Sequence, residues 1–134
     1  MTKKETAIEM KGISKSFGGV KAIKSTNLIV EKGTIHALVG ENGAGKSTLM
    51  KILCGLITKD SGKITILGKE TEIESYVHSQ ELGIAIVPQE LSLVESFTVA
   101  ENIFLGREPV SKCGIVDKKK LFADTEELLK KLNI

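Results

Sequence analysis

The sequence contains a single arginine, Arg107, and all its other basic residues are lysines. Sites that recognise phosphates or bases through paired hydrogen bonds normally use several arginines, so the composition argues against a nucleic-acid-binding groove. The net charge of +2 is also too small to indicate binding to nucleic acid or to an anionic membrane.

The sequence has only two cysteines and no long apolar run. Cys54 and Cys113 are far apart and fit no metal-binding or redox spacing. No apolar run approaches the roughly 20 residues of a membrane-spanning helix, and the N-terminus lacks the apolar segment of a signal peptide. We therefore expect a cytosolic protein with reduced thiols, in which Cys54 is a small core residue.

The chain has enough apolar residues for a folded core. Its 134 residues are 41% hydrophobic and 27% charged, which is typical of a soluble globular protein and not of a disordered one. The sequence contains no internal repeat and no low-complexity segment.

The most informative stretch is GENGAGKST, residues 40–48. Its first eight residues fit the phosphate-loop pattern of glycine, four variable residues, glycine, lysine and serine or threonine. A mostly apolar run of strand length, 34–39, precedes it. After it, Leu49, Ile52 and Leu56 recur at the spacing of a buried helix face. This strand–loop–helix context favours a phosphate loop over a glycine-rich turn before an ordinary helix.

The backbone of this motif suits a polyphosphate. Its three glycines allow backbone angles and close approaches that a side chain would block, so that successive N–H groups can point inward. The helix that begins near Gly45 adds unpaired N–H groups and the positive end of its dipole. We therefore expect nine nucleotide-binding residues: Gly40, Glu41, Asn42, Gly43, Ala44, Gly45, Lys46, Ser47 and Thr48.

Three side chains of the motif have individual roles. Lys46 is placed to reach the β and γ phosphates, which makes it a candidate catalytic residue. The Ser47 hydroxyl can bind Mg²⁺, and Thr48 can donate a hydrogen bond to the α phosphate. The motif therefore predicts a nucleotide polyphosphate with Mg²⁺, and by itself it fits kinases, GTPases and many ATPases; the cofactors ATP and Mg²⁺ follow only from the family resemblance given below.

Periodicity and turn residues predict the other elements. Strands are expected at five places: 7–11, 27–30, 34–39, 63–67 and 84–87. Helices are expected at 45–54, 75–82 and 98–105, and from Asp117 onward. The turn at 31–33 suggests a hairpin between the second and third strands, and 12–19 is expected to be a loop. The predicted class is mixed α/β with a β-rich lobe.

Three further features narrow the family. Phe17 lies ahead of the phosphate loop, and the strand at 84–87 runs into Pro88-Gln89-Glu90. The stretch LSLVESFTVAENIFLGREP follows at 91–109. Together these features resemble the ATP-binding cassette of an ABC transporter. The last stretch is most similar to the subclass that energises bacterial uptake of ribose, galactose or xylose.

The resemblance implies roles for two residues outside the loop. Phe17 corresponds to the aromatic residue that stacks on adenine, a position often filled by tyrosine, and the alternative is a loop aromatic that caps the core. Gln89 corresponds to the glutamine whose side-chain oxygen approaches Mg²⁺ and the attacking water. The alternative for Gln89 is a polar loop residue. The implied catalytic pair is Lys46 and Gln89, and the implied metal-binding pair is Ser47 and Gln89.

The resemblance also implies an architecture, partners and a location. The fold is expected to be the P-loop NTPase core of an ABC cassette with an antiparallel β lobe. Residues 1–134 would be the N-terminal part of one nucleotide-binding domain, with the β lobe and core at about 6–90 and the start of the helical subdomain at about 91–134. The implied partners are permease subunits facing residues 90–101, a second cassette and, indirectly, a sugar-binding protein outside the membrane. The implied location is the cytoplasmic side of the membrane.

Several parts of the family's catalytic cycle are not found in this sequence. It contains no serine-glycine-glycine-glutamine signature, no later apolar strand ending in Asp-Glu, and no switch histidine beyond it. We therefore expect a fragment, cut within the helical subdomain, with exposed apolar surface. The intact protein is expected to be an ATPase, whereas this chain should bind Mg–ATP weakly at most and hydrolyse it at no useful rate.

Two other functions remain open. One is a cassette protein that acts on ribosomes or DNA, which salt-sensitive binding to RNA or duplex DNA would indicate. The other is a nucleotide-binding module without hydrolysis, which tight binding by a soluble monomer would indicate. The importer-like stretch at 91–109 and the scarcity of arginine favour transport.

Overall fold

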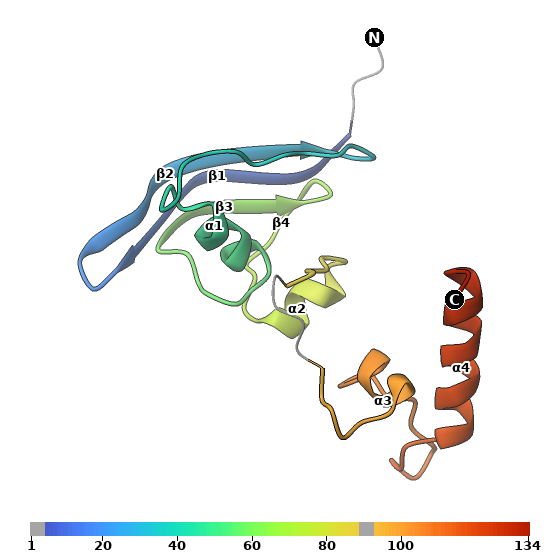
Figure 1. The fold of residues 1–134 in the computed structure, drawn as a ribbon. Coiled ribbons are helices and arrows are strands. Elements are labelled where there is room, and N and C mark those ends of the chain that lie inside the picture. Colours follow the sequence, from blue (N-terminus) through green and yellow to red (C-terminus); the bar gives the residue numbers. More distant parts are fainter. Residues whose placement is uncertain (1–4, 89–92) are drawn as a thin grey trace. The chain divides into compact units, whose positions relative to one another are not determined.

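The computed structural model describes residues 5–88 and 93–134. Contacts divide the chain into two compact units, Met1–Val87 and Pro88–Ile134. Figure 1 labels the elements of both units. In the described ranges, no helix is long and apolar enough to cross a membrane.

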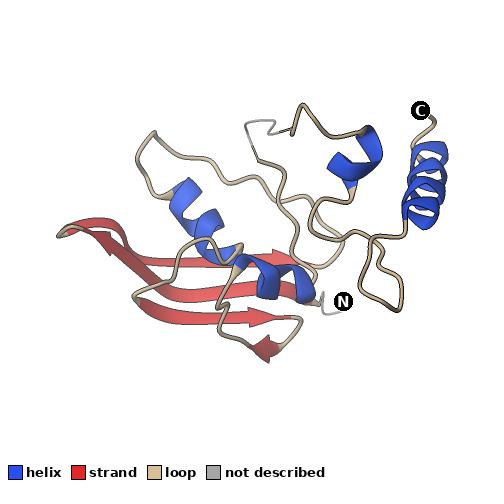
Figure 2. Cartoon of the chain, turned by 90° about the horizontal axis from the view of Figure 1, so that it is seen from below, coloured by secondary structure: helices blue, strands red, loops and turns tan. Residues whose placement is uncertain are grey.

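A four-stranded antiparallel sheet is the frame of the first unit (Figure 2). The strands are β1 (Thr6–Phe17), β2 (Val20–Glu31), β3 (Ser61–Ile66) and β4 (Lys69–Glu70). Their spatial order is β2-β1-β3-β4. The turn between β1 and β2 is Gly18-Gly19, with φ of 52° and 85°. Positive φ at both turn residues matches the twist of a hairpin and costs glycine nothing.

Helix α1 (Lys46–Leu53) packs on this sheet and completes the core (Figure 1). Ile13 and Ile64 from the sheet and Ile52 from the helix are almost fully buried. Each such side chain contributes about 1.5–3 kcal/mol through removal of apolar surface from water. The core consists of Met10, Ile13, Ile23, Leu28, Leu49, Ile52, Leu53, Ile64, Ile66 and Ile73.

Helix α2 (Tyr76–Glu81) is attached to the end of α1. Its N-cap is Ser75, whose hydroxyl oxygen accepts from the His78 N–H at 3.1 Å. The buried Ser79 hydroxyl donates to the Cys54 carbonyl at 2.9 Å. Gly55 lies between the two helices with a φ of 69°, and a Cβ there would collide with the Ser75 carbonyl. The predicted helix at 75–82, the helix end near residue 54 and the buried position of Cys54 are confirmed.

The second unit contains helices α3 (Val99–Ile103) and α4 (Lys118–Lys131). Thr98 and Glu101 form a capping box at α3, with Thr98 N–H donating to the Glu101 carboxylate at 2.9 Å. This bond and one from the Thr98 hydroxyl hold the pKa of Glu101 below its usual value. Asp117 caps α4 through the Lys120 N–H at 3.1 Å. The helices expected from residue 98 and from Asp117 are therefore confirmed, and these two residues are their N-caps.

The predicted strands at 34–39 and 84–87 are wrong. Both segments are irregular, and Ile35, Val39 and Val87 are almost fully exposed. Their apolar, β-branched composition is typical of strands buried between two neighbours. Within residues 5–88 and 93–134, no strand pairs with either segment, so neither forms the backbone hydrogen bonds that define a strand.

The predicted hairpin is also wrong. Strand β2 pairs with β1 through Gly18-Gly19, and residues 12–17, predicted as a loop, belong to β1. A register shift between Met10 and Ile13 interrupts the alternation of buried and exposed side chains. Gly12 lies in this bulge with a φ of 60°, and its N–H donates to the Asn27 side chain at 2.7 Å. The bulge explains why periodicity ended the strand too early.

Gly45 joins α1 to the sheet. It has a φ of 84°, and a Cβ there would lie 2.7 Å from the Ala22 carbonyl oxygen and 3.0 Å from the Ile23 side chain. Gly43 has a nearly equal φ of 86°, but a Cβ there would meet nothing within 4 Å. Substitution of Gly43 therefore measures the cost of the backbone conformation alone. Substitution of Gly45 measures that cost together with the cost of crowding against β2.

We expect Gly43→Ala to lower the free energy of unfolding by about 1–2 kcal/mol, because alanine disfavours the left-handed conformation. Gly45→Ala should cost about 1–3 kcal/mol more, since its methyl group must also displace β2. Urea unfolding followed by far-ultraviolet circular dichroism measures both. Equal unfolding midpoints for the two variants would show that the Gly45–Ala22 approach is not tight.

Candidate functional site

The predicted phosphate loop, 40–48, leads directly into α1. Gly43 and Gly45 both have left-handed backbone angles, and the Ala44 N–H donates to the Glu41 carbonyl at 3.2 Å. Gly40 is different, because a Cβ there would make only ordinary contacts of 3.6 and 3.7 Å. The structure thus gives a backbone reason for two of the three glycines in the motif.

Lys46 folds back over the loop that precedes it. Its Nζ donates to the carbonyl oxygens of Gly40 at 2.6 Å and Glu41 at 2.7 Å. These two bonds hold the ammonium group against the loop backbone, close to the start of α1. A lysine in this position places a point charge where an anion bound by the loop would lie.

The N-terminus of α1 is uncapped. Gly45 is the N-cap and has no side chain to accept from the first-turn N–H groups, and the first turn contains no acidic residue. The other helices in the described ranges, α2, α3 and α4, have side-chain caps from Ser75, Thr98 and Asp117. The first N–H groups of a helix have no acceptor within the helix, so those of Lys46, Ser47 and Thr48 can bind an anion.

Phe17 lies at the end of β1 and is half exposed. It pairs with Val20, two residues before the Ala22 carbonyl that Gly45 approaches. The strand register therefore places Phe17 at the same end of the hairpin as the loop. The structure brings the predicted aromatic residue and the predicted loop into one unit.

Two residues beside Phe17 were not predicted. The Lys15 Nζ lies 5.5 Å from the centre of the Phe17 ring and 2.8 Å from an Asp60 oxygen. The bonds from Lys15 and from the Ser16 N–H lower the pKa of Asp60. Lys15 could have been predicted beside Phe17 from the sequence, because residues two apart share one face of a strand. Asp60 could not have been predicted from nearby residues, because its contact with Lys15 depends on the pairing of β1 with β3.

Gln89, the second predicted catalytic and metal-binding residue, lies outside the described residues. In residues 5–88 and 93–134, no group of three or more His, Cys, Asp and Glu side chains could hold a metal ion by itself. The Ser47 hydroxyl is exposed at the uncapped helix start. A single hydroxyl suits Mg²⁺ that arrives with phosphate oxygens and waters as its other ligands.

The first unit has a cavity beside the phosphate loop. A cavity of about 120 Å³ borders the phosphate loop, between β2 and the segment before the loop. Apolar side chains make up much of its lining, and the phosphate loop contributes the rest of one side. The lining residues are Ile23, Thr26, Leu38, Val39, Ala44, Gly45, Lys46 and Leu49.

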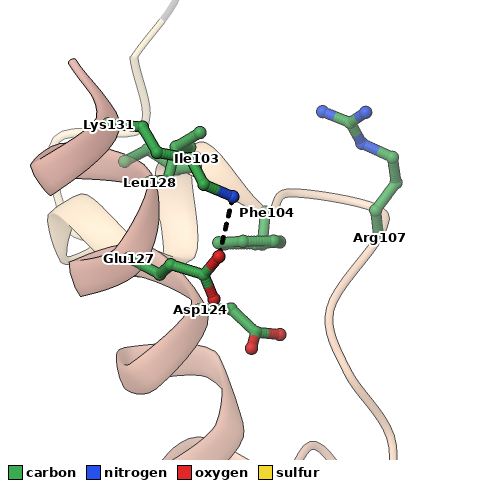
Figure 3. Close-up of a pocket in the computed structure, with 7 residues that line it drawn as sticks. All are labelled: Ile103, Phe104, Arg107, Asp124, Glu127, Leu128 and Lys131. Carbon is green, nitrogen blue, oxygen red and sulfur yellow. Dashed lines mark ion pairs between the residues drawn. The ribbon is translucent and has the colours of Figure 1, made fainter.

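A cavity of about 490 Å³ lies between α3 and α4. Figure 3 shows the side chains that line it. Apolar groups of Ile103, Phe104 and Leu128 meet charged groups at its edge, where Lys131 and Glu127 form an ion pair of 2.7 Å. A further cavity of about 420 Å³ in this unit is mostly apolar. Its lining residues are Leu93, Val94, Glu95, Phe97, Val99, Asn102 and Ile103.

The chain resembles known proteins along its whole length. The family model for the ABC transporter matches residues 23–134. The galactose/methyl galactoside import ATP-binding protein MglA of Clostridium tetani (strain Massachusetts / E88) is 49% identical over 137 aligned residues. The alignment covers 100% of this chain and 27% of that relative, so the chain spans 27% of its length.

Solved structures support the same grouping. A nucleotide-free ATP-binding cassette from an ABC transporter matches 88% of this chain and 46% of its own, with 27% identity and a TM-score of 0.70. The structure of cbiO1 from Clostridium perfringens, part of the ABC transporter complex cbiONQ, matches 98% of this chain and 52% of its own. Its TM-score is 0.68 and its identity 22%, which concerns the fold alone.

These matches confirm the predicted fold class, an α/β P-loop NTPase core with an antiparallel lobe. They also confirm the family resemblance drawn from Phe17, the phosphate loop and residues 88–109. The family model matches most of the length of this chain, and the chain therefore belongs to the ABC transporter family.

Proposed function

We propose that this chain provides the ATP-binding loop of the ATP-hydrolysing subunit of a bacterial monosaccharide importer. The observation that carries the proposal is the uncapped N-terminus of α1 with the Lys46 ammonium held beside it. A helix start without a competing carboxylate, next to a fixed cation, suits a polyphosphate.

The loop and the first turn of α1 supply hydrogen-bond donors for a polyphosphate. The N–H groups of Lys46, Ser47 and Thr48 donate to phosphate oxygens, and Thr48 can add its hydroxyl. The Lys46 ammonium exchanges one carbonyl partner, from Gly40 or Glu41, for an oxygen of the β or γ phosphate. A bond from the ammonium to an anionic phosphate oxygen is stronger than the bond to an uncharged carbonyl oxygen that it replaces.

Magnesium fits the same site. Ser47 is the residue of this chain that would hold Mg²⁺, which would supply positive charge to the β and γ phosphates. Phe17 is proposed to stack on the adenine, which its half-exposed ring permits. The role of Gln89 in binding Mg²⁺ and orienting water remains a prediction.

The domain organisation is proposed on the same basis. Residues 1–134 would form the N-terminal part of one nucleotide-binding domain, with the core ending near residue 90 and the helical subdomain beginning near 91. The division of contacts between Val87 and Pro88 supports this boundary. Segments 34–39 and 84–87 have no strand partner among the described residues, and further strands of such a domain would pair with them.

The transported sugar and the partners are proposed from the relative. The 49% identity to a protein named for galactose and methyl galactoside import supports a monosaccharide. The apolar cavity bordered by Phe97, Val99 and Ile103 overlaps the predicted permease-facing stretch at 90–101. A permease element would dock there, on the cytoplasmic side of the membrane. A second cassette and a sugar-binding protein complete the proposed assembly.

Nucleotide binding is tested by removing the Lys46 charge. We expect the 134-residue chain to bind Mg–ATP weakly and Lys46→Met to weaken binding about tenfold to a hundredfold, as for other bonds to charged groups. Lys51→Met is the matched control, because Lys51 is an exposed lysine of the same helix. Chemical-shift titration measures the affinities. Equal affinity of the two variants would contradict the proposed loop, and Lys46-dependent ATPase activity would contradict the expected inactivity of the chain.

Sugar import is tested in cells, with the gene that encodes this chain. A bacterial strain without its gene should lose uptake of labelled galactose, ribose or xylose. The unaltered gene and Lys51→Met should restore uptake, whereas Lys46→Met should not, because energy coupling needs bound ATP. Unchanged uptake of all three sugars, together with salt-sensitive RNA binding, would instead favour a nucleic-acid function.

A further inference from the structure

Lys15 connects Phe17 to the turn before β3. Its Nζ lies 5.5 Å from the centre of the Phe17 ring and 2.8 Å from an Asp60 oxygen. The Lys15 side chain is only 14% exposed. A cation within about 6 Å of a ring centre is attracted by the ring's negative face. Lys15 therefore covers one face of the Phe17 ring, and Phe17 as a whole remains half exposed.

Asp60 is itself held in place by β1. Its carboxylate accepts from the Ser16 N–H at 2.7 Å, and its own N–H donates to the Ser14 carbonyl at 2.9 Å. The hydroxyls of Ser14 and Ser61 share a hydrogen bond of 2.7 Å. The Asp60 carboxylate thus has its own fixed position, set by the backbone on the N-terminal side of Phe17.

The turn around Asp60 also packs closely on β1. A Cβ at Gly62 would lie 2.6 Å from the Lys11 carbonyl oxygen and 2.7 Å from the backbone of Gly12. This close approach keeps the Asp60 carboxylate beside the end of β1. A lysine side chain is long and flexible, so an ion pair to a fixed carboxylate restricts where its ammonium can lie.

We propose that Asp60 and Lys15 are positioning residues that present the uncovered face of Phe17 to the adenine base of a bound nucleotide. The inference rests on the proposed function, in which Phe17 stacks on adenine. Lys15 occupies one face, so a base can stack only on the other. The two residues should then affect recognition of the base and leave recognition of the triphosphate unchanged.

Two ligands separate these contributions: Mg–ATP and the Mg²⁺ complex of inorganic tripolyphosphate, which has no base. Chemical-shift titration of the 134-residue chain measures both affinities. Phe17→Ala should weaken ATP binding about tenfold through lost stacking. Asp60→Asn and Lys15→Met should each weaken ATP binding on the order of threefold, because the ring is retained but less well held. Tripolyphosphate binding should not change in any of the three.

Lys15→Arg should keep near-normal ATP affinity, because guanidinium both pairs with a carboxylate and stacks on a ring. Asp60→Asn should have no further effect in a Phe17→Ala background, since both changes act through one ring. The matched control is Lys59→Met. Lys59 is the neighbour of Asp60, its side chain is 13% exposed, and it pairs with Glu72 at 2.7 Å. Losing that pair should change neither affinity.

Each contrary outcome identifies what is wrong. No ATP binding by the unaltered chain would overturn the proposed function and this inference with it. Unchanged ATP affinity in Phe17→Ala would show that Phe17 does not stack on adenine. Lys15 and Asp60 could then not act by positioning it. Normal ATP affinity in Asp60→Asn and Lys15→Met, or equal losses for ATP and tripolyphosphate, would overturn this inference alone. Lys15→Met decides the question if Asp60→Asn does not fold.

Discussion

The close approach of Gly45 to the Ala22 carbonyl is the constraint on which the site depends. It requires a residue without a side chain at the start of α1, and it fixes that start against β2. The same glycine deprives the helix of a side-chain cap. One steric requirement therefore both positions the helix N-terminus on the sheet and leaves its N–H groups accessible to an anion.

The predictions that succeeded depend on local chemistry. The start of α1 directly after the glycine loop at 40–48 was predictable from the motif, whereas phosphate binding by that loop stays a prediction. The caps at Ser75, Thr98 and Asp117 begin helices near the predicted positions, since a capping hydroxyl or carboxylate acts within three residues of itself. For such features the sequence neighbours are also the spatial neighbours.

The predictions that failed depend on distant partners. Residues 34–39 and 84–87 have the composition of buried strands, but a strand forms only when another strand pairs with it. The bulge at Gly12 hid the continuation of β1 in the same way, because it depends on the pairing with β2. Asp60 could not be identified beside Phe17 without knowing the register of β1 and β3. Gln89 stays a prediction from the family alone.

The uncapped start of α1 has a consequence for folding. An N-cap normally stabilises a protein by about 1 kcal/mol, and α1 does without one. A phosphate group bound there would act as a removable cap, so that nucleotide binding and helix stability are one thermodynamic process. A ligand at a hundred times its dissociation constant adds about 2.7 kcal/mol to the stability of the folded state. A higher nucleotide concentration would then stabilise the folded chain further.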